Sequence, residues 1–203
     1  MPLKRATSPI SSSFAIDLKS TLSCTLCAHY TMSDFKGTKM TTEILLMIML
    51  TGVGATLCTD LWAIVQKRVL GIPPLNYALV GRWFIGLFDG RFYHAPIMAA
   101  PVRRGEKAMG WLLHYAIGVA FAFIPLGLAG IAWYAAPTPL VALLSGWLSL
   151  AAPFFVMQPA LGFGVAAANT PNPTRSRIIS LLVHTVYGLG LFVSARLLAP
   201  LLA

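Results

Sequence analysis

The chain has 203 residues, of which 57% are hydrophobic and only 10% are charged, and its mean hydropathy is +0.75. An average soluble domain carries about 25% charged residues, so this composition excludes an ordinary soluble globular protein. The net charge is +9, but the cations gather in connections between apolar stretches. We therefore expect the lipid bilayer as the partner, and no nucleic acid.

Residues 1–39 differ from the rest of the chain because they are rich in Ser, Thr and Lys and hold only short apolar patches. We expect a disordered extension or a start site assigned too far upstream. Met40 would be a natural start, since Thr41 or Thr42 is a good helix cap and Glu43 suits a first helical turn. The domain is then predicted over residues 40–203.

Four apolar stretches follow, each long enough to cross the roughly 30 Å hydrocarbon core of a bilayer as a helix. The spans are predicted at about 44–65, 108–134, 140–168 and 178–198. Trp133 and Tyr134, at the end of the second span, are the residue types that form belts at membrane interfaces. The predicted fold is all-α, an integral membrane four-helix bundle.

The connection over residues 69–107 is too long for a tight turn. Within it, Leu75–Phe88 is apolar and aromatic but short for a span, and it is interrupted by Arg82. This pattern predicts an additional interfacial or re-entrant helix. We expect Arg82 to line a cytoplasmic entrance to the bundle.

The charges of the connections orient the spans. The first and third connections carry cations, whereas the second, Ala135 to Pro139, carries none. Because basic loops stay in the cytoplasm, the sequence predicts a multi-pass protein of the bacterial cytoplasmic (inner) membrane with both termini outside. The cations in question are Lys67, Arg68, Arg82, Arg91, Arg103, Arg104, Lys107, Arg175 and Arg177.

Three ionisable residues are expected at one depth of the bundle. Asp60 lies seven residues before Lys67, while His114 and His184 lie seven residues after Lys107 and Arg177. Seven residues correspond to about 10 Å of helix, so all three would lie about equally far from the cytoplasmic surface. Ionisable groups at membrane depth are costly and mark candidate functional sites. Tyr115 and Tyr187 follow as further members of this predicted polar layer.

Four interpretations of the layer remain open. The histidines suit a proton relay, because their ordinary pKa is about 6.5. A layer of polar groups also suits a path or binding site for a small polar solute or ion. Two histidines and one carboxylate suit a divalent transition metal, and hence a metal-dependent intramembrane enzyme. Alternatively, the same residues only fix the helix register of a structural or accessory subunit.

The third span contains Pro153 and Pro159 with Gln158 between them. Each proline removes a backbone hydrogen bond and bends or breaks a helix, and broken helices line binding sites in transporters. A packed kink is the alternative. If the break is functional, Gln158 is the expected recognition group.

The motifs of soluble catalysis, such as Gly-x-Ser-x-Gly, His-Glu-x-x-His and the Walker loop, do not occur in the sequence. The sequence therefore favours a protein that is not an enzyme, and it predicts no cofactor. Our leading prediction is the binding or conduction of a small polar solute, ion or proton. Four helices enclose little space, so a homodimer would favour conduction.

From Met40 onward the chain resembles a family of small bacterial inner-membrane proteins classed as domain of unknown function 2938. The resemblance implies a four-helix inner-membrane protein and supplies no activity. The segments that carry it are Gly52 to Thr56, Thr59 to Trp62, Leu79 to Trp83, Gly110 to Gly118, Ala152 to Gly162, Asn169 to Pro173, His184 and Tyr187 to Gly190.

Overall fold

A computed structural model describes residues 42–202, so the expectation for residues 1–39 lies outside the described part of the chain. Within residues 42–202 the regular elements are all helical. In chain order they are α2 (Thr42–Leu70), α3 (Tyr77–Leu87), η1 (Ile97–Ala99), α4 (Glu106–Phe121), α5 (Ile124–Ala129), α6 (Ala132–Ala135), α7 (Pro139–Ser149), η2 (Pro153–Met157), α8 (Gln158–Ala160), η3 (Val165–Ala167), α9 (Pro173–Leu198) and η4 (Ala199–Leu202).

Four helical stretches of the described chain are long and apolar enough to cross a membrane, which confirms the predicted fold class. They are Thr42–Leu70, Glu106–Ala129, Pro139–Ala160 and Pro173–Leu198. The third is shorter than the predicted 140–168, because the chain turns at Gly162, where φ is +87°.

Local sequence explains where two helices begin. The side chain of Asn172 accepts a hydrogen bond of 3.0 Å from the backbone of Arg175, and Pro173 occupies the first turn, so α9 starts earlier than the predicted residue 178. In the same way Asn76 accepts from the backbone of Ala78 and caps α3. This apolar helix of 11 residues is too short to be counted among the spans.

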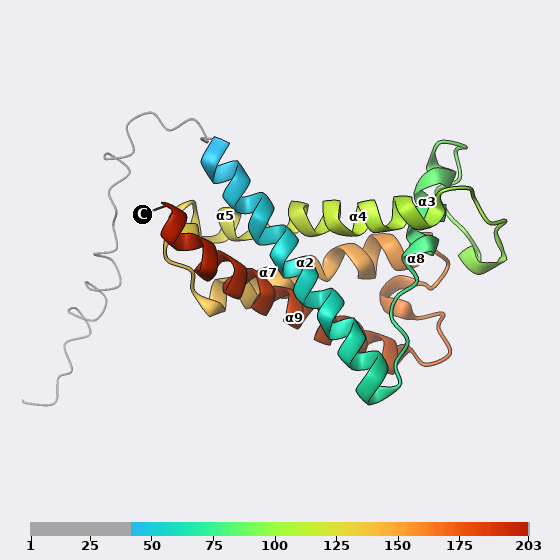
Figure 1. Cartoon of the computed structure of the whole chain (residues 1–203). Helices are drawn as coiled ribbons and strands as arrows, with labels where there is room; N and C mark the ends of the chain where they lie inside the picture. The colour runs from blue at the N-terminus through green and yellow to red at the C-terminus, as the bar shows by residue number, and fades with distance from the viewer. Residues whose placement is uncertain (1–41, 203) are drawn as a thin grey trace, which may run out of the picture. The chain divides into compact units, whose positions relative to one another are not determined.

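The helices of residues 42–202 pack in a defined order of neighbours. α2 crosses the bundle and packs against both α4 and α9, while α7 packs on α9 and α3 on α4 (Figure 1). Glycines permit the closest approaches. A Cβ on Gly190 of α9 would lie 2.8 Å from the Cα of Ala55 in α2, and one on Gly52 would lie 2.7 Å from the Cα of Val119 in α4.

The buried apolar core gathers around the first half of α2, the short helix α6 and the second half of α9. It contains Ile44, Met47, Ile48, Ala55, Ala122, Trp133, Tyr134, Ala142, Tyr187, Leu191 and Ala195. Trp133 and Tyr134 are therefore not the interfacial belt that their position predicted, because only 3% and 0% of their surfaces are exposed. The Tyr134 hydroxyl donates to the carbonyl oxygen of Ala122, and α6 thereby folds back into the bundle.

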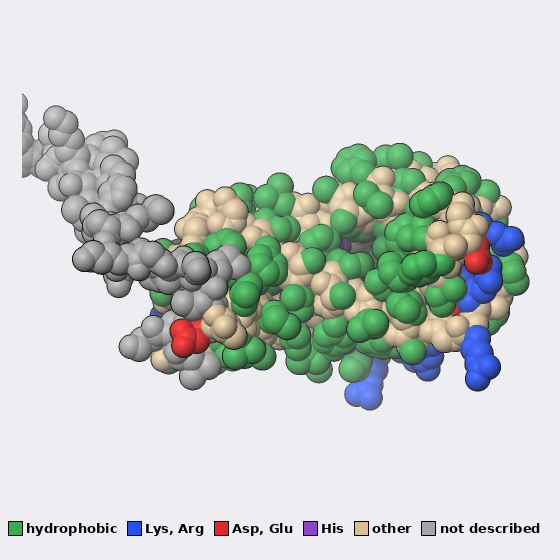
Figure 2. Space-filling model, turned by 90° about the horizontal axis from the view of Figure 1, so that it is seen from above, with side chains coloured by type: hydrophobic (Ala, Val, Ile, Leu, Met, Phe, Trp, Pro, Cys, Tyr) green, Lys and Arg blue, Asp and Glu red, His purple; other side chains and the backbone are tan. Residues whose placement is uncertain are grey.

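The outer surface of the helices is apolar. Large hydrophobic side chains are exposed on every long helix, for example Leu46, Leu61, Leu112, Leu148 and Leu197. Figure 2 shows hydrophobic side chains along the flank of the bundle and basic side chains at one end. A continuous apolar flank on helices of this length is what lipid contact requires, so the chain has the build of a membrane protein.

Candidate functional site

Three members of the predicted polar layer are in direct contact. Asp60 of α2 and His114 of α4 are joined by a hydrogen bond of 2.9 Å between Oδ1 and Nε2, and the exposed fractions of the two side chains are 20% and 15%. The Tyr115 hydroxyl donates to the second carboxylate oxygen of Asp60, at 2.8 Å. This carboxylate therefore joins α2 to two successive residues of α4.

His184 of α9 belongs to a different hydrogen-bonded group. Its Nδ1 lies 2.7 Å from the Oγ of Ser149, at the end of α7. The Ser149 hydroxyl also donates to the carbonyl oxygen of Gly146, at 2.7 Å. No metal-ligating group of three or more His, Cys, Asp or Glu side chains occurs among the described residues, so Asp60, His114 and His184 do not form one cluster there.

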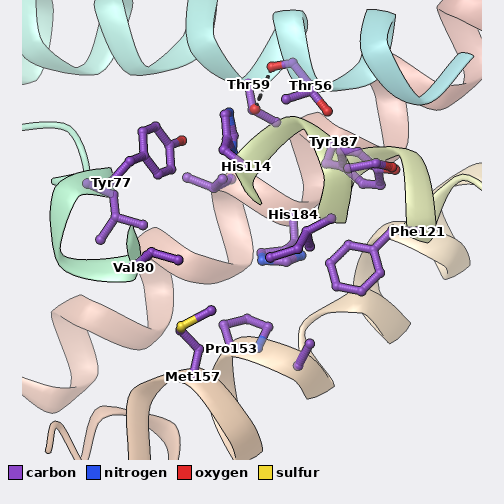
Figure 3. Close-up of a pocket in the computed structure, with 15 residues that line it drawn as sticks. Thr56, Thr59, Tyr77, Val80, His114, Phe121, Pro153, Met157, His184 and Tyr187 are labelled. Carbon is purple, nitrogen blue, oxygen red and sulfur yellow. Dashed lines mark hydrogen bonds between the residues drawn. The ribbon is translucent and has the colours of Figure 1, made fainter. Parts of the chain in front are cut away.

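A cavity of about 200 Å³ connects the two groups. His114, His184 and Tyr187 line it, together with residues of α2, α3, α4, η2 and α9, and Figure 3 shows the two histidines projecting into the same space. The remaining lining residues are Thr56, Thr59, Leu75, Tyr77, Val80, Ile117, Gly118, Phe121, Ala152, Pro153, Met157 and Val183.

Most polar groups of the lining are already engaged with the backbone. The Thr56 hydroxyl donates to the carbonyl of Gly52, and that of Thr59 donates to the carbonyl of Thr56. The Tyr187 hydroxyl donates to the carbonyl of Gly118 across the bundle, at 2.6 Å. These hydroxyls therefore stabilise the helices, and their protons are not available to a solute.

Tyr77, at the start of α3, is a polar lining residue that the sequence pattern did not point to. Its ring stacks on the imidazole of His114, with centroids 4.1 Å apart and an angle of 25° between the planes. Burial raises the pKa of the Tyr77 phenol, and the negative charge of Asp60 raises it further. The phenol therefore remains protonated at neutral pH and keeps an O–H that can donate.

The apolar flank is hollowed at mid-length. In Figure 2 a histidine side chain is visible inside this hollow, among hydrophobic side chains and away from the basic end. His114 and His184 are the histidines of the spans, and both line the cavity. The cavity is therefore reached from the side of the bundle that is suited to lipid.

Arg82 has a different place from the cytoplasmic entrance that the sequence suggested. It does not line the cavity, and its guanidinium binds both carboxylate oxygens of Glu106, at 2.7 and 2.9 Å. It also donates to the carbonyl oxygen of Ala100, at 2.8 Å. The hydrogen bond to Glu106 raises the pKa of the Arg82 guanidinium above its ordinary value. Arg82 thus holds α3 and the following loop against the start of α4.

The two prolines of the third span have different surroundings. Pro153 begins the π-helical turn η2 and lines the cavity, whereas Pro159 lies in α8 and does not. Gln158 is also absent from the lining, and its buried Oε1 has no hydrogen-bond partner in the described chain. The broken helix therefore contributes Pro153 and Met157 to the cavity, and its amide lies elsewhere.

Two residues that contact the histidines could not be predicted, because no sequence pattern marks them. Ser149 is one of two serines in an apolar helix, and Tyr77 is one aromatic residue among many in its segment. The partner of Arg82 was easier to predict, because Glu106 is one of only six acidic residues in the chain. Pairing this scarce carboxylate with an arginine in an apolar segment would have been a sound expectation.

Comparison with known proteins agrees with the resemblance seen in the sequence. Residues 49–198 match the family model described as "Protein of unknown function (DUF2938)". No curated protein and no solved structure matches the chain. The family match covers most of the 203 residues and nearly all of the helical bundle, and on this ground the chain belongs to the DUF2938 family.

Proposed function

We propose that the protein binds a small, uncharged and largely apolar solute in the cavity between His114 and His184. The observation that carries this proposal is the cavity itself, which brings together five helical elements around about 200 Å³ of space. This proposal departs from the expectation of a small polar solute, ion or proton, because most residues that line the cavity are apolar.

The volume limits the size of the solute. An engineered apolar cavity of about 150 Å³ is sufficient to bind benzene. The present cavity is somewhat larger and has Phe121, Tyr77 and Tyr187 in its wall. A molecule with one or two aromatic rings fits this space, whereas a phospholipid does not.

The lining argues against an ion as the ligand. Within the described residues it contains neither a carboxylate nor a Lys or Arg side chain. The nearest carboxylate, that of Asp60, is engaged by His114 and Tyr115. A desolvated ion would find no opposite charge here, so an uncharged solute is favoured.

Binding of naphthalene tests the proposal. The protein is placed in lipid nanodiscs, and saturable binding is measured against nanodiscs without protein. Met157→Trp should abolish binding, because the larger side chain fills the cavity from η2. Val156→Trp is the matched control, since Val156 is 57% exposed and does not line the cavity. Absence of saturable binding to the wild type, or equal loss in both variants, would contradict the proposal.

A second candidate function is favoured by the contact between Asp60 and His114. A carboxylate and an imidazole 2.9 Å apart can exchange a proton, which would suit a proton-coupled protein. Proteoliposomes should then show proton flux above that of empty liposomes, and Asp60→Asn should remove it. A flux that is unchanged by Asp60→Asn would reject this candidate. The pair would then have the register-fixing role of a structural or accessory subunit.

We also propose an orientation of the bundle in the membrane. Exposed cations lie near the end of α2 and the starts of α4 and α9, including Lys67, Arg104, Lys107 and Arg177. Figure 1 shows these three helix ends on the same side of the bundle. We infer that this end faces the cytoplasm across the inner membrane and that α3 lies at the interface. The inference places both chain termini outside, and the apolar flank with its hollow then faces the bilayer.

A further inference from the structure

The position of the proton on His184 follows from its neighbour Ser149. The Oγ of Ser149 lies 2.7 Å from the carbonyl oxygen of Gly146 and 2.7 Å from the Nδ1 of His184. A carbonyl oxygen only accepts, so the single hydroxyl proton of Ser149 belongs to the bond with Gly146. The Nδ1 of His184 must then carry a proton and donate it to Ser149. In a neutral imidazole this leaves the lone pair on Nε2.

That lone pair is free for a ligand. Within the described residues, the Nε2 of His184 has no hydrogen-bond partner. It also differs from the unpartnered polar atoms that are sealed by protein, a group that includes the Nδ1 of His94 and the Oε1 of Gln158. His184 lines the cavity, and its ring lies between Phe121 and Pro153 in the view of Figure 3. An unpaired acceptor in apolar surroundings is costly, so a donor there is stabilised.

The other polar groups of the cavity point to the same ligand chemistry. His114 uses Nε2 in its contact with Asp60, so a neutral ring that donates to the carboxylate also keeps its lone pair on Nδ1. The hydroxyls of Thr56, Thr59 and Tyr187 all donate to backbone carbonyls. The O–H of Tyr77 remains available, but Tyr77 lies beside His114 and away from His184 (Figure 3). A donor for the Nε2 of His184 therefore has to come from the ligand.

We propose that the cavity selects an aromatic alcohol of the phenol class, whose O–H donates to the Nε2 of His184. This inference rests on the proposed function and adds the hydrogen-bonding group that the ligand carries. Ser149 acts as a positioning residue, because its hydroxyl holds the imidazole in the tautomer that accepts. The rings of Tyr77 and Phe121 would contact the aromatic part of the ligand.

Two matched probes test the selection without any change to the protein. 1-Naphthol carries the hydroxyl, and 1-methoxynaphthalene replaces its proton by a methyl group. Both are titrated against the protein in nanodiscs, and affinities are referred to the probe concentration in the bilayer. One hydrogen bond of ordinary strength predicts that the naphthol binds about tenfold more tightly than the ether.

Variants then locate the acceptor. His184→Leu should remove the preference for the naphthol while binding of the ether persists. Ser149→Ala should reduce the preference, because the imidazole is then free to adopt the other tautomer. Phe121→Leu is the matched control from the same wall. It should weaken the binding of both probes by a similar factor and leave the ratio of their affinities unchanged.

The outcomes separate this inference from the proposed function. A preference for the naphthol that disappears in His184→Leu supports both. Equal binding of naphthol and ether to the wild type overturns the phenol selection and leaves the binding function standing. A preference that survives in His184→Leu also overturns it, because another group must then accept the hydroxyl proton. If neither probe binds saturably, the proposed function fails together with this inference.

Discussion

Arg82 and Glu106 form a buried ion pair in a chain that has few charges. The exposed fractions of their side chains are 10% and 11%, and the guanidinium meets the carboxylate through two hydrogen bonds. The backbone N–H of Arg103 donates to the same carboxylate, at 2.9 Å. With these partners neither charge is left uncompensated, and the pair fixes α3 to the start of α4.

Removal of one partner should be far more damaging than removal of both. Arg82→Met leaves a buried, unpaired Glu106 carboxylate and should lower the free energy of unfolding by about 3 kcal/mol, whereas the double variant with Glu106→Leu should lose much less. Denaturant titration in detergent micelles measures the difference. Arg103→Met is the control, because its partner Asp89 and its own side chain are 45% and 34% exposed. It should cost less than about 1 kcal/mol, and an equal cost for both single variants would refute the buried-pair account.

At the residue scale the sequence was informative about depth and much less informative about partners. Asp60 and His114 could be assigned to one level from their spacing to the basic ends, and the structure brings them into contact. His184 was expected in the same group, but its partner is Ser149. The spacing along a helix gives the level of a side chain, whereas its partner depends on helix rotation. Rotation is set by packing that no single sequence reveals.

Close helix contacts depend on glycines that allow the backbones to touch. Gly190 lies against Ala55, and a Cβ at this position would be 2.8 Å from the Cα of that alanine. The obstacle is backbone, which cannot move aside as a flexible side chain would. The contact between α2 and α9 therefore requires glycine at residue 190.

Gly190→Ala should lower the free energy of unfolding by about 1–3 kcal/mol, because α2 and α9 must separate to admit the methyl group. Gly127→Ala is the matched control, since nothing lies within 4 Å of the added Cβ on α5. That change should be neutral or stabilise by up to about 1 kcal/mol, because alanine is the better helix former. The same denaturant titration measures both variants. An unchanged free energy of unfolding in Gly190→Ala would argue against the tight contact.

At the element scale the spans were predictable because their apolar length is a strong signal. The residues at which the spans begin and end were less predictable. The expected fourth span began at residue 178, whereas Asn172 and Pro173 start α9 earlier. The π-helical turn at Pro153 is a local response to a missing N–H, and its exact form depends on the neighbours that take up the freed carbonyl.

The bundle has two unlike ends and an apolar flank between them. The basic end, with Lys67, Arg104 and Arg177, contrasts with the uncharged turn that joins α6 to α7. On the proposed orientation, which follows the positive-inside rule, the basic end lies in the cytoplasm. In the sequence, the rule uses only the charges of the connections. The fold adds that the first and third connections lie at the same end of the bundle.

Labelling of single cysteines in intact cells tests this orientation. With Cys24, Cys27 and Cys58 replaced, Ala136→Cys should react with a membrane-impermeant maleimide from outside. Ala99→Cys, near the basic end, should react only after the membrane is permeabilised. Both positions are exposed, so a difference in labelling reports the side of the membrane. The reverse pattern would invert the proposed topology.

On the proposed function, the cavity between His114 and His184 holds a small aromatic solute. A crystal structure of the protein grown with 1-bromonaphthalene tests this claim most directly, because bromine gives an anomalous signal that lipid and detergent do not. If the solute binds there, an anomalous peak appears inside the cavity beside His184 and Phe121, and it is lost in Met157→Trp. Bromine found only on the outer apolar flank, with an unoccupied cavity, would contradict it.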